Sequence, residues 1–151
     1  MRLMGIYPQI LDAKGRTSVP AQIREELAKA AVEKLVVTTD QEGGHDCLAV
    51  YPEPEWDKLI RKFDKLPPMD PAVENFRNHH VAPAQMVTMD KQGRILIPQS
   101  LRDDTGLGNK VVVVAAGDIF RLWDAEVWAQ VRQISKQSFA DAKKALAADL
   151  R

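Results

Sequence analysis

The segment LDAKGRTSVP, residues 11–20, has a close copy, MDKQGRILIP, at residues 89–98. The copies lie 78 positions apart, and both contain the pattern Asp-x-x-Gly-Arg. Asp favours the first position of a tight turn, and Gly supplies the left-handed conformation that such a turn needs. The sequence therefore predicts the same hairpin turn twice, at residues 12–16 (turn one) and at residues 90–94 (turn two).

The repeat continues beyond the two turns. Pro20 and Arg24 correspond to Pro98 and Arg102 at the same spacing, and the β-branched run at residues 34–39 corresponds to the run at residues 110–115. The last matching segments, residues 47–56 and 119–128, are only 72 positions apart. The first copy therefore has six additional residues, which we place in the loop at residues 40–46. The chain is a duplicated unit of about half its length.

Each copy is expected to form an extended segment, the turn, a second short strand, a helix that begins at a proline, and two more strands. Helices follow each copy, and their apolar residues recur at helical spacing. The first, at residues 53–66, has Trp56, Leu59, Ile60, Phe63 and Leu66 on one face. The C-terminal one, from about residue 125 to 150, has Trp128, Val131, Phe139, Ala142 and Leu146. Asp70 and Pro71 are expected to cap and begin a linking helix.

Neither copy has enough strand to bury a core alone. We therefore predict an α+β fold, mainly one small β barrel with helices, built jointly by two half-domains about a pseudo-twofold axis. The half-domains are residues 5–53 and 83–126, joined by a helical linker at residues 54–82 and followed by a C-terminal helix at residues 127–151.

Composition agrees with a globular protein and gives little sign of its partners. The 151 residues have a net charge of zero, yet the first 24 carry four basic side chains and one acidic side chain. No apolar run is long enough to span a membrane, and no signal peptide is evident. With a single cysteine, Cys47, no intrachain disulfide can form, so a cytoplasmic location is expected.

The residues give thin support for catalysis, a cofactor or a metal site. Of the three histidines, His79 and His80 are adjacent and would point in different directions on a helix, and His45 stands apart. Cys47 lies between apolar residues and is interpreted as a core residue. No glycine-rich phosphate loop is present. The carboxylates of Asp12 and Asp90 align between the two copies and could suggest acid–base catalysis, but each precedes an arginine by four residues. We therefore interpret Asp12, Gly15, Asp90, Gly93 and Arg94 as parts of a turn clamp.

Each turn projects basic side chains from a hairpin tip: Lys14 and Arg16 from turn one, Lys91 and Arg94 from turn two. A two-stranded ribbon of this kind fits the major groove of DNA, where such groups contact phosphates and guanine edges. The alternative is that Asp and Arg pair simply to make a stable hairpin. The two interpretations are compatible, because a clamp that fixes the arginine also preorganises it.

Two Asp-x-x-Gly-Arg turns, each followed by two strands and a tryptophan-containing helix start (PEPEW and WDAEVW), resemble the MraZ family over about residues 5–128. The resemblance implies tandem AbrB-like swapped-hairpin half-domains, ring-like homo-oligomers and a DNA-binding transcriptional regulator of the nucleoid. It further implies repression of the family member's own operon of division and cell-wall genes, through short direct repeats in the promoter. The family's Asp-x-x-x-Arg motif falls on Asp12 and Arg16, and on Asp90 and Arg94.

The two copies differ after their arginines. The first continues with Thr17-Ser18-Val19 and the second with Ile95-Leu96-Ile97, which is typical of a strand covered on both faces. We therefore assign the first copy to DNA contact and the second to packing or subunit contact. The predicted DNA-binding residues are Lys14, Arg16, Thr17, Arg24 and Arg2. The alternative is an AbrB-like protein-interaction module, similar to an antitoxin, that acts through a protein partner.

Overall fold

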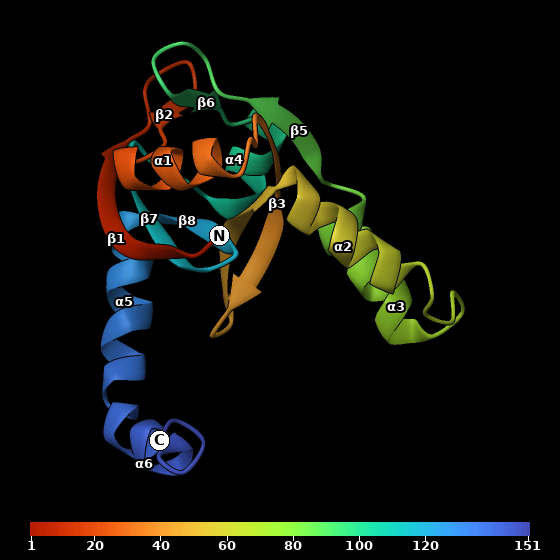
Figure 1. Ribbon diagram of the computed structural model, residues 1–151, viewed down its shortest axis with the longest axis vertical. Helices are drawn as coiled ribbons and strands as arrows, with labels where there is room; N and C mark the ends of the chain where they lie inside the picture. Colours follow the sequence, from red (N-terminus) through yellow and green to blue (C-terminus); the bar gives the residue numbers. More distant parts are fainter.

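The fold is described from a computed structural model that covers residues 1–151 (Figure 1). Eight strands and six α-helices form an α+β protein in which every strand pairing is antiparallel. The strands are β1 (Leu3–Ile10), β2 (Arg16–Ser18), β3 (Lys34–Glu42), β4 (His45–Pro52), β5 (Gln85–Thr88), β6 (Arg94–Leu96), β7 (Lys110–Gly117) and β8 (Ile119–Asp124). The helices are α1 (Ala21–Lys29), α2 (Glu53–Phe63), α3 (Pro71–Phe76), α4 (Gln99–Thr105), α5 (Ala125–Lys136) and α6 (Phe139–Leu146), with a π-helical turn, η1 (Arg77–Val81), after α3.

The two copies exchange their first two strands; β1 does not pair with β2, nor β5 with β6, so the hairpin predicted at each turn is corrected to a turn between strands of different sheets. One sheet has the strand order β1-β7-β8-β4-β3-β5, so β1 of the first copy pairs with β7 of the second, and β5 of the second pairs with β3 of the first. Strands β2 and β6 form a separate two-stranded ribbon. In the middle of the sheet β4 pairs with β8, where Ala49 lies opposite Arg121. The counterparts in the two copies are β1 and β5, β3 and β7, and β4 and β8. Exchanging each strand for its counterpart gives the same strand order read from the opposite edge of the sheet. A pseudo-twofold axis therefore passes beside the Ala49–Arg121 pair.

The core lies between the sheet, the ribbon and helices α1 and α4. Its 18 buried side chains come from both copies, with Ile23 and Leu27 from α1 and Leu101 from α4. The predicted α+β class and the joint core are confirmed. The sheet itself is open rather than a closed barrel, because β1 and β5 form its two edges and are not bonded to each other. The β2–β6 ribbon and the two helices cover the core on the remaining side.

The six additional residues of the first copy are divided between two places. Helix α1 has nine residues and α4 has seven, so two of the six lengthen a helix. Val36 pairs with Tyr51 in the β3–β4 hairpin, and the corresponding pair in the β7–β8 hairpin is Val112 with Trp123. The first pair encloses four more residues than the second, so the other four additional residues lie in the β3–β4 hairpin. The prediction of one insertion at residues 40–46 is therefore corrected. The longer hairpin carries Asp40 and Glu42, which bind Arg121 at 3.0 and 3.1 Å.

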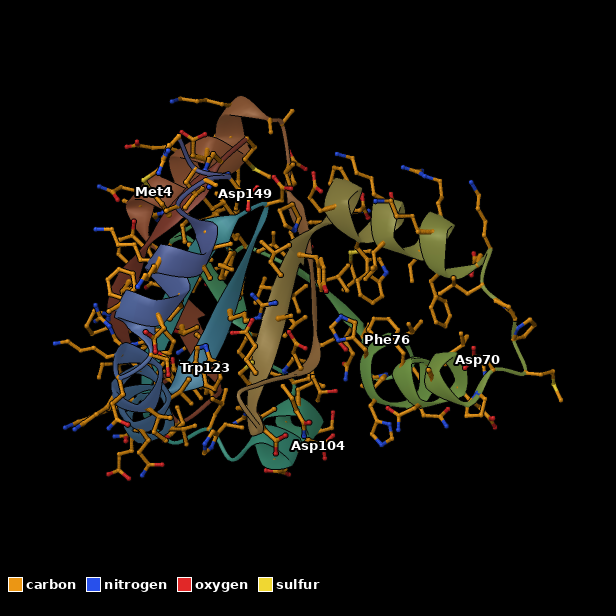
Figure 2. The ribbon with its side chains drawn as sticks, turned by 90° about the horizontal axis from the view of Figure 1, so that it is seen from below. Met4, Asp70, Phe76, Asp104, Trp123 and Asp149 are labelled. Atoms are coloured by element: carbon orange, nitrogen blue, oxygen red, sulfur yellow. The ribbon has the colours of Figure 1, made fainter.

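Two helical arms extend from the body on different sides (Figure 1). Helices α2 and α3 form one arm, and α5 and α6 form the other. Each arm contacts the sheet through a tryptophan near its start: Trp56 packs on Tyr51, with ring centroids 5.1 Å apart, and Trp128 on Trp123, 5.7 Å apart (Figure 2 labels Trp123). No helix is long and apolar enough to cross a bilayer.

The predicted C-terminal helix is two helices, because the chain turns at residues 137–138. Serine side chains compete for backbone hydrogen bonds and weaken a helix, and the sequence there is Ser-Lys-Gln-Ser. The predicted apolar stripe divides accordingly. Its members Phe139 and Leu146 on α6 are exposed rather than packed on the sheet.

The linker after α2 is fixed to the first copy. Asp70 Oδ1 accepts a hydrogen bond of 2.8 Å from the Ala72 N–H, which confirms the predicted cap of α3. His80 is buried, and its Nδ1 lies 2.8 Å from the Thr39 carbonyl oxygen. A carbonyl only accepts, so Nδ1 carries the proton and Nε2 accepts from the Tyr51 hydroxyl at 2.7 Å. Burial lowers the pKa of His80, which favours this neutral form.

Candidate nucleic-acid interface

A single carboxylate organises turn one. Asp12 Oδ1 accepts the backbone N–H groups of Lys14 at 3.0 Å and Arg16 at 2.8 Å, and Oδ2 accepts from Arg16 Nε at 2.8 Å. Gly15 has φ of +89°, in the left-handed region that glycine adopts at low cost. The Arg16 backbone N–H, followed by its guanidinium, lowers the pKa of Asp12. The carboxylate therefore stays charged at neutral pH and holds the Arg16 side chain in one orientation.

Turn two has the same geometry. Asp90 Oδ1 accepts from the N–H groups of Gln92 at 2.8 Å and Arg94 at 3.0 Å, while Oδ2 accepts from Arg94 Nε at 2.9 Å. Gly93 has φ of +76°. Hydrogen bonding by the Arg94 backbone N–H is the main cause that lowers the pKa of Asp90. The two turns are thus equivalent in backbone, ion pair and protonation state.

Strands β2 and β6 join the two turns into one surface at the top of the molecule in Figure 1. Arg16 lies opposite Leu96, and Ser18 lies opposite Arg94. Side chains paired directly across an antiparallel ribbon share a face. The four outward side chains, Arg16, Ser18, Arg94 and Leu96, therefore form one continuous surface, the ribbon face.

The inner face of the ribbon is part of the core and corrects one predicted contact. Thr17 lies opposite Ile95, is only 3% exposed, and its hydroxyl has no hydrogen-bond partner. From this position Thr17 cannot contact DNA, because the residue alternation of β2 directs it inward.

Within one chain, the second copy's strand is covered on one face only, so a cover on its other face would have to come from another subunit. Leu96 is 54% exposed. The side chain of Arg94 is 31% exposed, close to the 33% of Arg16. Strands β2 and β6 pair with each other over the same core, so one face of each is buried and the other is open. Exposure alone therefore gives no reason to separate the two copies.

The other predicted DNA-binding residues are dispersed. Lys14 is exposed in turn one, near Arg16. Arg2 precedes β1 whereas turn one follows it, and a strand of eight residues spans about 26 Å. Arg24 lies at turn two, where its Nη1 donates to the Gln92 carbonyl oxygen at 3.4 Å. The structure thus brings Lys14 and Arg16 together with Arg94, and leaves Arg2 at the opposite end of β1.

The turns and the ribbon are locally basic on a chain with no net charge. Residues 12–18 and 90–96 contain four basic side chains, Lys14, Arg16, Lys91 and Arg94, and two acidic ones, Asp12 and Asp90. Each acidic group is bonded to an arginine, so the remaining charge of this surface is positive.

Sequence reasoning missed Leu96 and Ser18 as neighbours of the arginines, and it missed Arg102, whose guanidinium lies against Gly15 of turn one. Each depends on a contact between copies rather than on a local pattern. The signal that could have found them is the register between β2 and β6, which pairs the start of one short strand with the end of the other.

Elsewhere the chain has little that resembles catalytic chemistry. Burial raises the pKa of Cys47 to about 12, so its thiol is not a ready nucleophile. A polar cavity of about 630 Å³ lies among η1, the β3–β4 hairpin and α4, with Asn75, His79 and Asp104 in its wall (Figure 2 labels Asp104). The wall also includes His80, Asp40 and Asp46, and it contains no Ser, Cys or Lys. No group of three His, Cys, Asp or Glu side chains is placed to hold a metal ion.

These features define a class: a tandem protein of two copies that exchange strands and present a basic ribbon. The family model described as "MraZ protein, putative antitoxin-like" matches residues 3–78 and 81–150. The chain belongs to the MraZ family.

Three relatives, each named transcriptional regulator MraZ, illustrate the similarity. The protein of Thioalkalivibrio sulfidiphilus is 40% identical over 85% of this chain and 83% of its own length. That of Coxiella burnetii is 39% identical over 85% and 84%, and that of Nitrosococcus oceani is 38% identical over 97% and 95%. The solution structure of PHS018 from Pyrococcus horikoshii aligns with 81% of this chain and 89% of its own, at 13% identity and a TM-score of 0.35. The family description and the names of the three relatives indicate no catalytic family.

Proposed function

We propose that this protein is a sequence-specific DNA-binding transcriptional regulator whose ribbon face enters the major groove. The observation that carries the proposal is the pair of partly exposed arginines, each fixed by an aspartate, on one two-stranded ribbon. Arginine fixed in this way is suited to bidentate contact with guanine, and a ribbon fits the groove. Lys14 and Lys91, exposed in the turns, supply phosphate contacts.

The spacing of the two arginines supports contact with a single DNA site. Two residues along a strand span about 6.6 Å and paired strands lie about 5 Å apart, so the Cα atoms of Arg16 and Arg94 are roughly 8 Å apart. The major groove is about 12 Å wide. Both arginines therefore fit one groove together, and we extend the proposed contact from the first copy to both.

Family membership supports the finer proposal that the protein represses its own operon of division and cell-wall genes. In this proposal a ring-like homo-oligomer binds closely spaced, short repeats in the promoter and thereby associates with the nucleoid. One subunit offers few basic contacts on a neutral chain, so its own affinity is low. Several linked ribbons raise the overall affinity by about 10²–10⁴-fold without new contacts.

Exposed apolar side chains support self-association. Met4, Ile6 and Ile10 lie on the open face of edge strand β1, and Phe139 and Leu146 lie on α6 (Figure 2 labels Met4). Contiguous apolar surface of this kind is typical of subunit contacts. Light scattering at micromolar concentration should give a mass several times 16.9 kDa. A stable monomer would remove the ring and the affinity argument with it.

The experiment that tests DNA binding is footprinting on the promoter upstream of the protein's own gene, followed by gel shift with the protected fragment. Arg16→Ala and Lys14→Ala should weaken binding, whereas Lys144→Ala on α6 should not, although it removes the same charge. Affinity should fall with salt with a log–log slope near −0.9 per phosphate contact. Equal losses for all three variants would indicate general charge attraction instead of a specific interface.

A second candidate function is that of an antitoxin-like module that binds a protein partner. The family description and an apolar groove between α2 and α3 favour it; the groove is lined by Leu59, Phe63, Leu66, Ala72, Val73 and Phe76. A stoichiometric protein partner recovered from nuclease-treated extract would favour this function, particularly if Phe63→Ser abolished recovery and left DNA binding intact.

A further inference from the structure

Each turn is in contact with a helix of the other copy. A Cβ atom added at Gly15 would lie 2.7 Å from Cζ and 2.8 Å from Nε of Arg102, so the guanidinium of this α4 residue lies directly against the glycine of turn one. A Cβ atom added at Gly93 would collide in the same way with Arg24 of α1. Only glycine permits so close an approach at either position.

Backbone hydrogen bonds follow the same crossed pattern. The Gly15 carbonyl oxygen accepts from the Ile97 N–H at 2.8 Å, and the Gly93 carbonyl oxygen accepts from the Val19 N–H at 2.9 Å. Arg102 Nε donates to the Ile97 carbonyl oxygen at 3.1 Å. Arg102 is thus bonded to Ile97, whose own N–H is bonded to turn one. Both Arg102 and Ile97 belong to the second copy, which contains turn two.

We propose that Arg102 is a positioning residue for turn one and Arg24 is a positioning residue for turn two, so that each basic turn is completed by the copy to which it does not belong. A planar guanidinium on the glycine restricts the turn and holds the neighbouring arginine of the ribbon face in place. Neither Arg24 nor Arg102 has an acidic partner, so each also adds positive charge beside its turn. The part of this inference that concerns DNA rests on the proposed function; the crossed support of the turns does not.

Hydrogen–deuterium exchange of the full-length protein without DNA tests the crossed support. Arg102→Gln should accelerate exchange of the turn-one amides at residues 12–16 and leave the turn-two amides at residues 90–94 unchanged. Arg24→Gln, its matched counterpart, should do the reverse. Faster exchange within the variant's own copy, or equal change in both turns, would overturn the inference. Thermal melting establishes that both variants are folded before the comparison.

Operator binding distinguishes positioning from direct phosphate contact. Arg102→Gln and Arg102→Lys should both weaken binding about tenfold, because lysine keeps the charge but cannot lie flat on Gly15. Arg102→Lys with wild-type affinity would show a charge contact and overturn the positioning role. The losses from Arg16→Ala and Arg102→Gln should be less than additive, and those from Arg94→Ala and Arg102→Gln additive. If the wild-type protein binds no promoter DNA, the proposed function fails while the exchange experiment still decides the crossed support.

Discussion

Turn one and turn two have the same hydrogen bonds and nearly the same exposure, yet their neighbours differ in polarity. Arg16 stands beside the exposed Leu96, and Arg94 stands beside Ser18. A leucine can contact the methyl group of thymine, whereas a serine hydroxyl can bond a base edge or a phosphate. Ser18, which follows turn one in the sequence, therefore lies beside Arg94 of turn two, and Leu96, which follows turn two, lies beside Arg16 of turn one. Where two copies exchange strands in this way, the surroundings of each turn are determined by the other copy.

The largest effect is expected from removing both arginines. Arg16→Ala combined with Arg94→Ala should weaken operator binding by about 30-fold or more, since each bidentate base contact contributes about 1–3 kcal/mol. The melting temperature should change little, because exposed ion pairs contribute about 0–1 kcal/mol. Gel shift and melting at one salt concentration measure both.

The single variants Arg16→Ala and Arg94→Ala decide whether both turns contact DNA. If the ribbon face acts as a unit, Arg16→Ala and Arg94→Ala weaken binding to a similar extent. An Arg94→Ala variant that binds like wild type would confine DNA contact to turn one, as the sequence alone suggested.

Next in size is the effect of alanine at the turn glycines. Gly15→Ala and Gly93→Ala should each lower the free energy of unfolding by about 1–3 kcal/mol, because a strained left-handed residue and a collision with an arginine occur together. Gly44→Ala is the matched control: its φ is +78°, but nothing lies within 4 Å of the added Cβ atom. Urea unfolding should rank Gly44→Ala as the mildest of the three. Equal losses would mean that Arg24 and Arg102 simply move aside.

A smaller effect, of opposite sign, is expected at the inner face of the ribbon. Thr17→Val should raise the free energy of unfolding by about 1 kcal/mol, since it removes a buried hydroxyl without a partner and gives β2 the apolar character of Ile95 in β6. Thr38→Val should lower the free energy of unfolding, because the buried Thr38 hydroxyl donates to the His80 carbonyl oxygen at 2.5 Å. Urea unfolding of the two variants gives the signs, and destabilisation by both would show that Thr17 has a bonded partner.

The smallest effect is expected from acid. The pKa values of Asp12 and Asp90 are lower in the folded protein than the value near 4 expected when unfolded. Their contribution to stability is therefore complete above about pH 4 and is lost as the pH falls through the lower, folded values. Asp12→Asn and Asp90→Asn should each reduce the acid dependence of unfolding by the same small amount. Unequal reductions would show that the two clamps are not equivalent.

Local chemistry was predictable from the sequence, and contact between copies was not. The Asp-x-x-Gly-Arg pattern and the Asp70-Pro71 cap specify structure within a few residues, so turn chemistry and capping rules are sufficient for them. The locations of Arg24, Arg102 and Leu96 depend on the register of β2 with β6. That register follows from packing over a shared core and not from any local propensity. The break at residues 137–138 was missed although the predicted stripe has no member between Val131 and Phe139, where positions 135 and 138 are both serine.

The pairing of β1 with β7 has a consequence for biosynthesis. Ile10 pairs with Lys110 and Leu3 with Gly117, so β1 leaves the ribosome without its partner β7, which follows about a hundred residues later. At about 5–20 residues per second, this interval is roughly 5–20 s. Throughout it, Met4, Ile6 and Ile10 lie on a strand without its partner β7, beside nascent chains of the same sequence. Neighbouring ribosomes on one message therefore present matching strands, and the second half of each chain must arrive before its first half can complete a sheet.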